Sequence, residues 1–110
     1  MKNLHFCERE KDNLLLIKNS PVGTKLDTYR TGFVPTLYSG DIINLTERIT
    51  GEKDKILVTA RVEYVFPFEF SELSEDIKHQ MEVSYSRWFN DHHWFFLIGL
   101  IIMKVIFLSS

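Results

Sequence analysis

Residues 58–64, within a predicted strand over residues 56–65, alternate strictly between apolar and polar side chains, and this pattern constrains the fold more than any other in the chain. Alternation with a period of two predicts a β-strand with one face in the core and the other in water, as in an antiparallel sheet. The apolar set is Val58, Ala60, Val62 and Tyr64, and the polar set is Thr59, Arg61 and Glu63. The chain is therefore expected to cover its core with one face of a sheet.

Patterns nearer the start of the chain predict two more strands and a helix. The strands cover residues 3–6 and residues 42–49, and a turn follows over residues 50–53. Residues 8–18 carry acidic side chains early and Lys18 last, which suits the dipole of a helix that stops at the Asn-Ser-Pro-Val-Gly sequence. Short strands and helical segments together predict an α+β fold.

A second helix is predicted to begin at Ser74, a favourable N-cap residue that is followed by two acids. Apolar side chains then recur at steps of four, four and three residues, which puts them on one helical face. They are Ile77, Met81, Tyr85 and Trp88. This face is expected to pack on the sheet.

Residues 94–108 form an apolar run rich in Phe, Ile and Val, which predicts a final strand. The run is shorter than the ~20 apolar residues that usually cross a bilayer as a helix. Membrane contact through this C-terminal segment stays open as the less favoured alternative, because thin or deformed bilayers accept shorter spans.

The composition indicates one ordinary globular domain over residues 1–110. Hydrophobic residues make up 45% and charged residues 25%, which excludes a disordered chain. The formal net charge of -2 argues against binding to long nucleic acids over a large basic surface, although a local basic site stays open. The single cysteine, Cys7, cannot form an internal disulfide, and no signal-peptide pattern opens the chain, so a cytoplasmic location is expected.

Polar chemistry gathers in the segment that follows Pro21 and Gly23. Lys25 can act as a base or an anion clamp, and Thr28 as a nucleophile or hydrogen-bond donor. Arg30 supplies a planar fork for a carboxylate, a phosphate or a base edge. The segment therefore predicts a small polar site on a loop and the strand that follows it.

This segment reads G-x-K-x-x-T-x-R, which resembles the signature of the ASCH family of PUA-like proteins. The order of the other elements is also similar, with a Gly40-Asp41 turn entering a strand and the predicted Ser74 helix before a last apolar strand. The resemblance covers about residues 3–100 and implies a small β-barrel of about five to six mostly antiparallel strands with two helices. Residues 101–110 extend past the last strand that the family pattern implies.

Some small bacterial members of this family resemble amidohydrolases that remove the acetyl group from acetylcytidine. Carried over residue by residue, Lys25 would take the proton of Thr28, whose oxygen would attack the acetyl carbonyl. Glu82 would be the downstream glutamate, and Arg30 would orient the substrate or stabilise developing negative charge. The resemblance thus implies a hydrolase for a modified nucleoside, with no cofactor.

A non-catalytic function of the same motif stays open. In an RNA- or nucleotide-binding module, Arg30, Tyr29 and Gly23 would hold a phosphate or a base edge. Thr28 separates the two hypotheses, because hydrolysis needs its hydroxyl whereas binding should tolerate valine. Glu82 also has a simpler explanation, since it lies one helical turn after Lys78 and could form a surface ion pair.

The catalytic hypothesis sets a geometric condition. Residues three apart on a straight strand point to opposite faces, so Lys25 and Thr28 can share a pocket only if Lys25 precedes the regular strand or a bulge intervenes. Gly23 makes an irregular entry to the strand credible.

The histidines and the cysteine lack the spacing of a metal site, so no metal is expected. The residues considered are His5, Cys7, His79, His92 and His93. The expected partner is a modified nucleoside or RNA, and the oligomeric state stays open.

Overall fold

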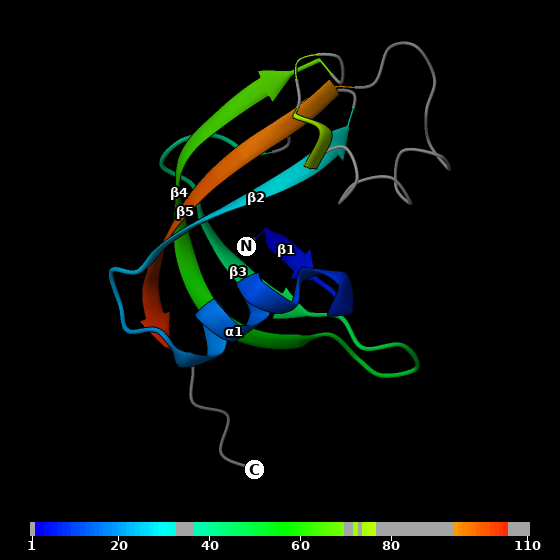
Figure 1. Ribbon diagram of the computed structural model, residues 1–110. Helices are drawn as coiled ribbons and strands as arrows, with labels where there is room; N and C mark the ends of the chain where they lie inside the picture. The colour runs from blue at the N-terminus through cyan, green and yellow to red at the C-terminus, as the bar shows by residue number, and fades with distance from the viewer. Residues whose placement is uncertain (1, 33–36, 70–71, 73, 77–93, 106–110) are drawn as a thin grey trace.

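The computed structural model describes residues 2–32, 37–69, 72, 74–76 and 94–105, which form one curled sheet with a helix beside it (Figure 1). The strands are β1 (Asn3–Phe6), β2 (Lys25–Gly32), β3 (Ile42–Glu47), β4 (Lys55–Phe68) and β5 (Trp94–Val105). A 3-10 turn, Glu8–Glu10, leads into the helix α1 (Lys11–Asn19). The fold is α+β, and its sheet is a half-barrel.

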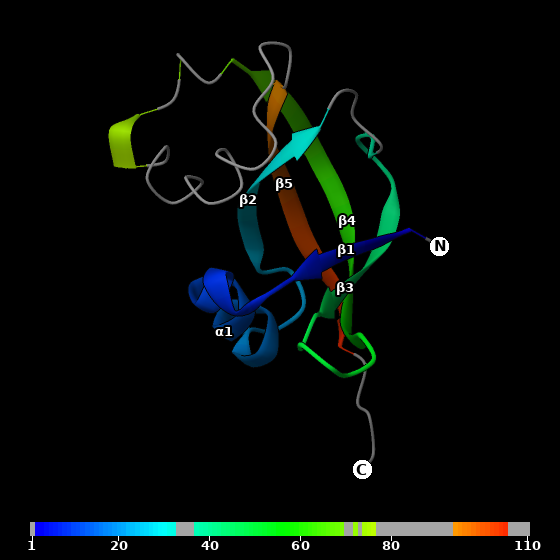
Figure 2. The same cartoon turned by 90° about the vertical axis from the view of Figure 1, so that its right-hand side faces the viewer.

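The strand order β1-β3-β4-β5-β2 puts the first two strands of the chain at opposite edges of the sheet. β1 pairs with β3 in parallel, and the other three pairs are antiparallel. The curl of the sheet brings both edge strands to the side of the molecule where α1 lies (Figure 2). The two edges therefore face each other next to the helix.

The core fills the concave side of the sheet. Leu14 and Ile17 of α1 are buried there, whereas Leu15 and Leu16 between them are exposed. All five strands contribute to the same cluster, with the side chains of Phe6, Leu26, Ile43, Leu45, Val58, Ala60, Val62, Phe96, Ile98, Leu100 and Ile102. Burial of this one face is the main stabilising contribution to the fold.

The structure confirms most of the predicted elements and moves some of their ends. The strands expected at residues 3–6 and 56–65 are present, and the second extends from Lys55 to Phe68. The strand expected over residues 42–49 ends at Glu47. The predicted first helix begins as a 3-10 turn, and the apolar positions of the helix expected from Ser74 lie outside the described residues.

The prediction that Tyr64 faces the core is wrong. The register between β4 and β5 shifts between Val62 and Tyr64, so Glu63 is the extra residue of a β-bulge. Val62 lies opposite the buried Leu100, whereas Tyr64 lies opposite Gly99 on the outer face. One additional residue reverses the inside-outside pattern of everything beyond it.

The apolar run near the C-terminus lies in the middle of the sheet as β5, between β4 and β2. Within the described part of the chain, no helix has the length and apolar character to cross a membrane. Residues 106–108 of the predicted strand lie outside the described residues.

Candidate functional site

The polar motif lies on β2, and the structure divides it between the two faces of the sheet. β2 pairs with β5 in unbroken register from Lys25 to Gly32, so its side chains alternate strictly. Thr28 is 2% exposed on the inner face, whereas Lys25 is exposed on the outer face. Lys25 belongs to the regular strand and no bulge follows it. The structure therefore does not bring Lys25 and Thr28 together.

The other expected site residues are divided in the same way. Gly23 lies in the turn before β2 with φ 94°, and its N–H donates to the Ile102 carbonyl oxygen (2.7 Å). Tyr29 is half-buried on the outer face and Arg30 lies on the inner face. Glu82 lies outside the described residues.

On the inner face, the hydroxyl of Thr28 both donates and accepts a hydrogen bond. It donates to Glu10 Oε2 (2.8 Å) and accepts from Arg30 Nε (3.1 Å). A carboxylate that accepts a threonine proton has the arrangement of a general base beside a nucleophile. Thr28 is almost fully buried, however, so a substrate does not reach its oxygen. The contact therefore serves the fold.

The Arg30 guanidinium joins the two edges of the sheet. From β2 it donates through Nη1 to the His5 carbonyl oxygen of β1 (2.6 Å), and its Cζ lies 4.6 Å from the centre of the Phe6 ring. Nη2 is buried 2.9 Å from Glu10 Oε1, close enough for an ion pair but without the alignment of a hydrogen bond. Burial lowers the pKa of Arg30, and the negative charge of Glu10 opposes that shift.

Glu10 is the hub of this inner cluster, and Asn13 extends it along the edge of β2. The Asn13 side-chain amide donates to Glu10 Oε2 (3.3 Å) and to the Asp27 carbonyl oxygen (3.1 Å). Arg30 and Asn13 thus each satisfy a carbonyl at a sheet edge, one on β1 and one on β2, and Glu10 holds both. We call Glu10, Asn13, Thr28 and Arg30 the edge clasp. Edge carbonyls without such partners invite pairing with other chains.

The outer face of the sheet has its own polar contact. The Tyr64 hydroxyl of β4 donates to Asp27 Oδ1 of β2, across the intervening strand β5. The ring passes directly over Gly99, where an added Cβ would lie only 2.2 Å from Tyr64 Cε1. Gly99 therefore provides the space that lets Tyr64 reach Asp27.

The hydrogen bond to Asp27 raises the pKa of Tyr64 from its ordinary 10.0 to about 12. Because the folded state holds this proton more tightly, the contact stabilises the fold fully below pH 10 and loses that contribution as the pH rises towards 12. We predict that a titration of tyrosinate absorbance contains a step near pH 12 that belongs to Tyr64. Asp27→Ala should bring this step down to the ordinary range, whereas Asp12→Ala in α1 should leave it in place. An unchanged upper step in Asp27→Ala would contradict the assignment.

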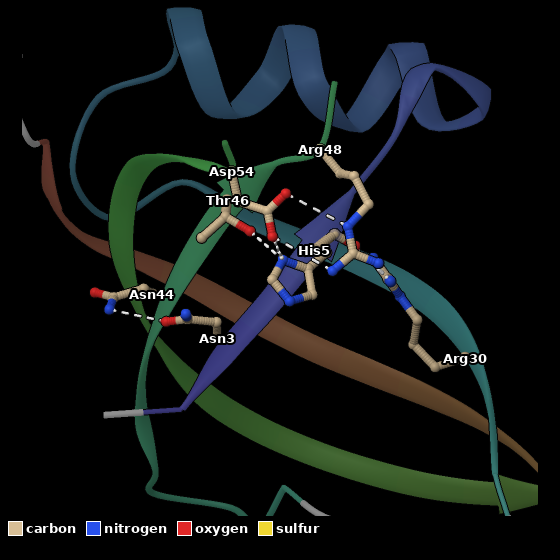
Figure 3. Close-up of polar contacts among 7 residues, drawn as sticks. All are labelled: Asn3, His5, Arg30, Asn44, Thr46, Arg48 and Asp54. Atoms are coloured by element: carbon tan, nitrogen blue, oxygen red, sulfur yellow. Dashed lines mark hydrogen bonds and ion pairs between the residues drawn. The ribbon is translucent and has the colours of Figure 1, made fainter. Parts of the chain in front are cut away.

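A second polar cluster lies where β1 meets the β3–β4 hairpin (Figure 3). His5 Nδ1 lies 2.6 Å from Thr46 Oγ1 and 3.1 Å from Asp54 Oδ2. Arg48 Nη2 lies 3.3 Å from the same Asp54 oxygen. A hydroxyl, an imidazole and a carboxylate occur together as in a hydrolytic triad, but both partners meet the same ring nitrogen. The ring therefore cannot pass a proton between them through its two nitrogens, and Thr46 is only 1% exposed.

The structure adds Glu10, Asn13 and Gly99 to the residues that the sequence singles out. Glu10 and Asn13 are three apart at the start of a helix, which is the spacing of neighbours on one face. Gly99 interrupts an apolar run, and a glycine inside a strand often marks a close approach by another group. Within the described residues, no three His, Cys, Asp or Glu side chains are grouped as metal ligands.

No protein-family model, curated protein or solved structure matches this chain.

Proposed function

We propose that the chain is a PUA-like module of the ASCH type that binds RNA or a nucleotide without catalysing a reaction. The order of strand, helix, motif strand, hairpin and last apolar strand, together with the half-barrel sheet, supports the family proposal. The observation that carries the functional proposal is the division of the motif. Thr28 and Arg30 are used inside the edge clasp, whereas Lys25 and Tyr29 face outward.

This division favours binding over the hydrolase that the family resemblance also implies. Hydrolysis by that route needs the Lys25 amine beside the Thr28 oxygen, and an unbroken strand holds the two side chains on opposite faces. Binding needs neither contact. An exposed lysine can hold a phosphate as a point charge, and an aromatic ring beside it can stack on a base.

The test is a binding measurement run beside an activity assay on the full chain. We expect the protein to bind RNA or a mononucleotide, to lose affinity in Lys25→Ala, and to leave acetylcytidine intact. Deacetylation that is lost in Lys25→Ala would contradict the proposal and restore the hydrolase. Absence of both binding and turnover in the folded protein would contradict both functions.

Thr28→Val separates the two functions further. Removing the hydroxyl leaves Glu10 Oε2 and Arg30 Nε without one of their partners, so we expect the free energy of unfolding to fall by about 1–2 kcal/mol. Affinity for RNA or nucleotide should stay within about twofold, because the outer face is unchanged. Chemical denaturation and equilibrium binding check the two statements. A loss of affinity in a folded Thr28→Val protein would place the ligand on the inner face and contradict the proposal.

A further inference from the structure

Two aromatic side chains on the outer face, one on β2 and one on β4, lie in register with a leucine of the intervening strand β5. Tyr29 of β2 and Phe66 of β4 both lie opposite Leu97 of β5, so the three side chains form one row on the same face. Phe66 is 54% exposed, and Tyr29 and Leu97 are half-buried. The Tyr64 ring lies beside Phe66, with 5.1 Å between the ring centroids. This row offers flat apolar surface on which bases can stack.

Two exposed lysines add positive charge to the same face. Lys25 lies opposite Ile101 and Lys104 lies opposite Thr59, and both lysines are exposed. Neither forms an ion pair with any residue that the structure describes. The Asp27 carboxylate on the same face keeps its negative charge while it accepts a hydrogen bond from the Tyr64 hydroxyl, so the two lysines together exceed it by one positive charge. The local charge therefore favours an anionic ligand although the chain as a whole is acidic.

We propose that this face binds single-stranded RNA, with bases stacked on Tyr29 and Phe66 and phosphates held by Lys25 and Lys104. The inference rests on the RNA- or nucleotide-binding function proposed above and gives it a position on the fold. Adjacent strands lie about 4.8 Å apart, and β5 separates the strands that carry the two rings, so each ring takes a different base. Paired bases expose no faces to side chains, so the ligand is unpaired.

The experiment measures the anisotropy of a fluorescent single-stranded RNA of about eight nucleotides as the full-length protein is added. Phe66→Ala and Tyr29→Ala should each weaken binding by about tenfold, because each removes one stacking contact. The matched control is Tyr38→Ala. Tyr38 is 60% exposed but lies in the loop before β3, under the ammonium group of Lys2. Its variant should bind within about twofold of the wild type.

The lysines are tested through the salt dependence of binding. Lys25→Ala should weaken binding and reduce the slope of log affinity against log salt by about 0.7, the value for one phosphate contact on a single strand. Lys53→Ala, an exposed lysine in the turn between β3 and β4, should leave the slope unchanged. A melting curve for each variant checks folding, and Tyr29→Leu replaces Tyr29→Ala if the latter unfolds, since leucine fills the site without stacking.

The results test separately the location of the site, the single-stranded nature of the ligand and the binding function itself. Wild-type affinity in both Phe66→Ala and Tyr29→Ala would overturn this location and leave the RNA-binding function standing elsewhere on the protein. Equal affinity for a duplex of the same sequence would overturn the single-stranded ligand. No binding of RNA or nucleotide by the wild-type protein would overturn the proposed function itself.

Discussion

Replacing Glu10 with alanine is expected to lower the free energy of unfolding by about 2 kcal/mol, which for a domain of this size is a fall of about 10 °C in melting temperature. Glu10 accepts from Thr28 and Asn13 and balances the charge of Arg30. Breaking a fully buried ion pair removes about 3–5 kcal/mol. The side chains here keep 23% and 26% exposure, so water screens part of the loss.

The matched control for this prediction is Glu8→Ala. Glu8 belongs to the same 3-10 turn and is exposed, and no hydrogen bond or ion pair joins it to a described residue. Its removal should change the melting temperature by only a few degrees, as for most surface sites. A double variant, Glu10→Leu with Arg30→Met, should lose less stability than the two single changes together, because no charge is left unpaired. Equal melting temperatures for Glu10→Ala and Glu8→Ala would show that the edge clasp does not stabilise the fold.

Gly99→Ala is expected to destabilise the protein by about 2 kcal/mol, although alanine is normally the better residue in a strand. The new Cβ would lie 2.2 Å from Tyr64 Cε1 and 2.3 Å from Cζ, so the ring must leave its place over β5. Its hydroxyl then loses the Asp27 carboxylate, and the raised pKa of Tyr64 returns towards 10.0. Denaturant unfolding and the tyrosinate titration measure the two effects on the same variant.

The sign of the Gly99→Ala effect should reverse when the ring is absent. In a Tyr64→Ala background nothing occupies the space above Gly99, and alanine there should stabilise the strand by about 0.5–1 kcal/mol through lower entropy of the unfolded chain. The same destabilisation in both backgrounds would mean that the tyrosine ring is not the cause. Such a double-mutant cycle isolates the contact from other effects of either change.

Local patterns were sufficient to predict the strands and the first helix. The alternation around Val58 and Val62 arises because one face of a single strand meets the core and the other meets water. It can therefore be recognised within a short stretch of sequence. The same period of two predicts that Lys25 and Thr28 meet only if the strand is irregular between them. The register of β2 is unbroken, so the two side chains lie on opposite faces. The sequence thus showed which geometry catalysis would need, but only the structure shows whether β2 has it.

Features that depend on distant pairing could not be predicted in this way. The position of Tyr64 is set by a bulge at Glu63, which exists only because β4 pairs with β5, some forty residues along the chain. Glu10 looks like an ordinary acid near a helix start until Thr28 and Arg30 are placed against it. The residue that binds Thr28 and Arg30 therefore lies outside the motif, and the motif alone does not point to it.

The position of β5 in the sheet has a consequence for the order in which a growing chain can fold. β2 and β4 both pair with β5, which the chain supplies only when residues 94–105 have been made. Until then the hairpin of β3 and β4 can form and β1 can add to it, but β2 has no backbone partner. On the ribosome, β2 must therefore wait for most of the chain before it can join the sheet, although it is among the first segments to be made.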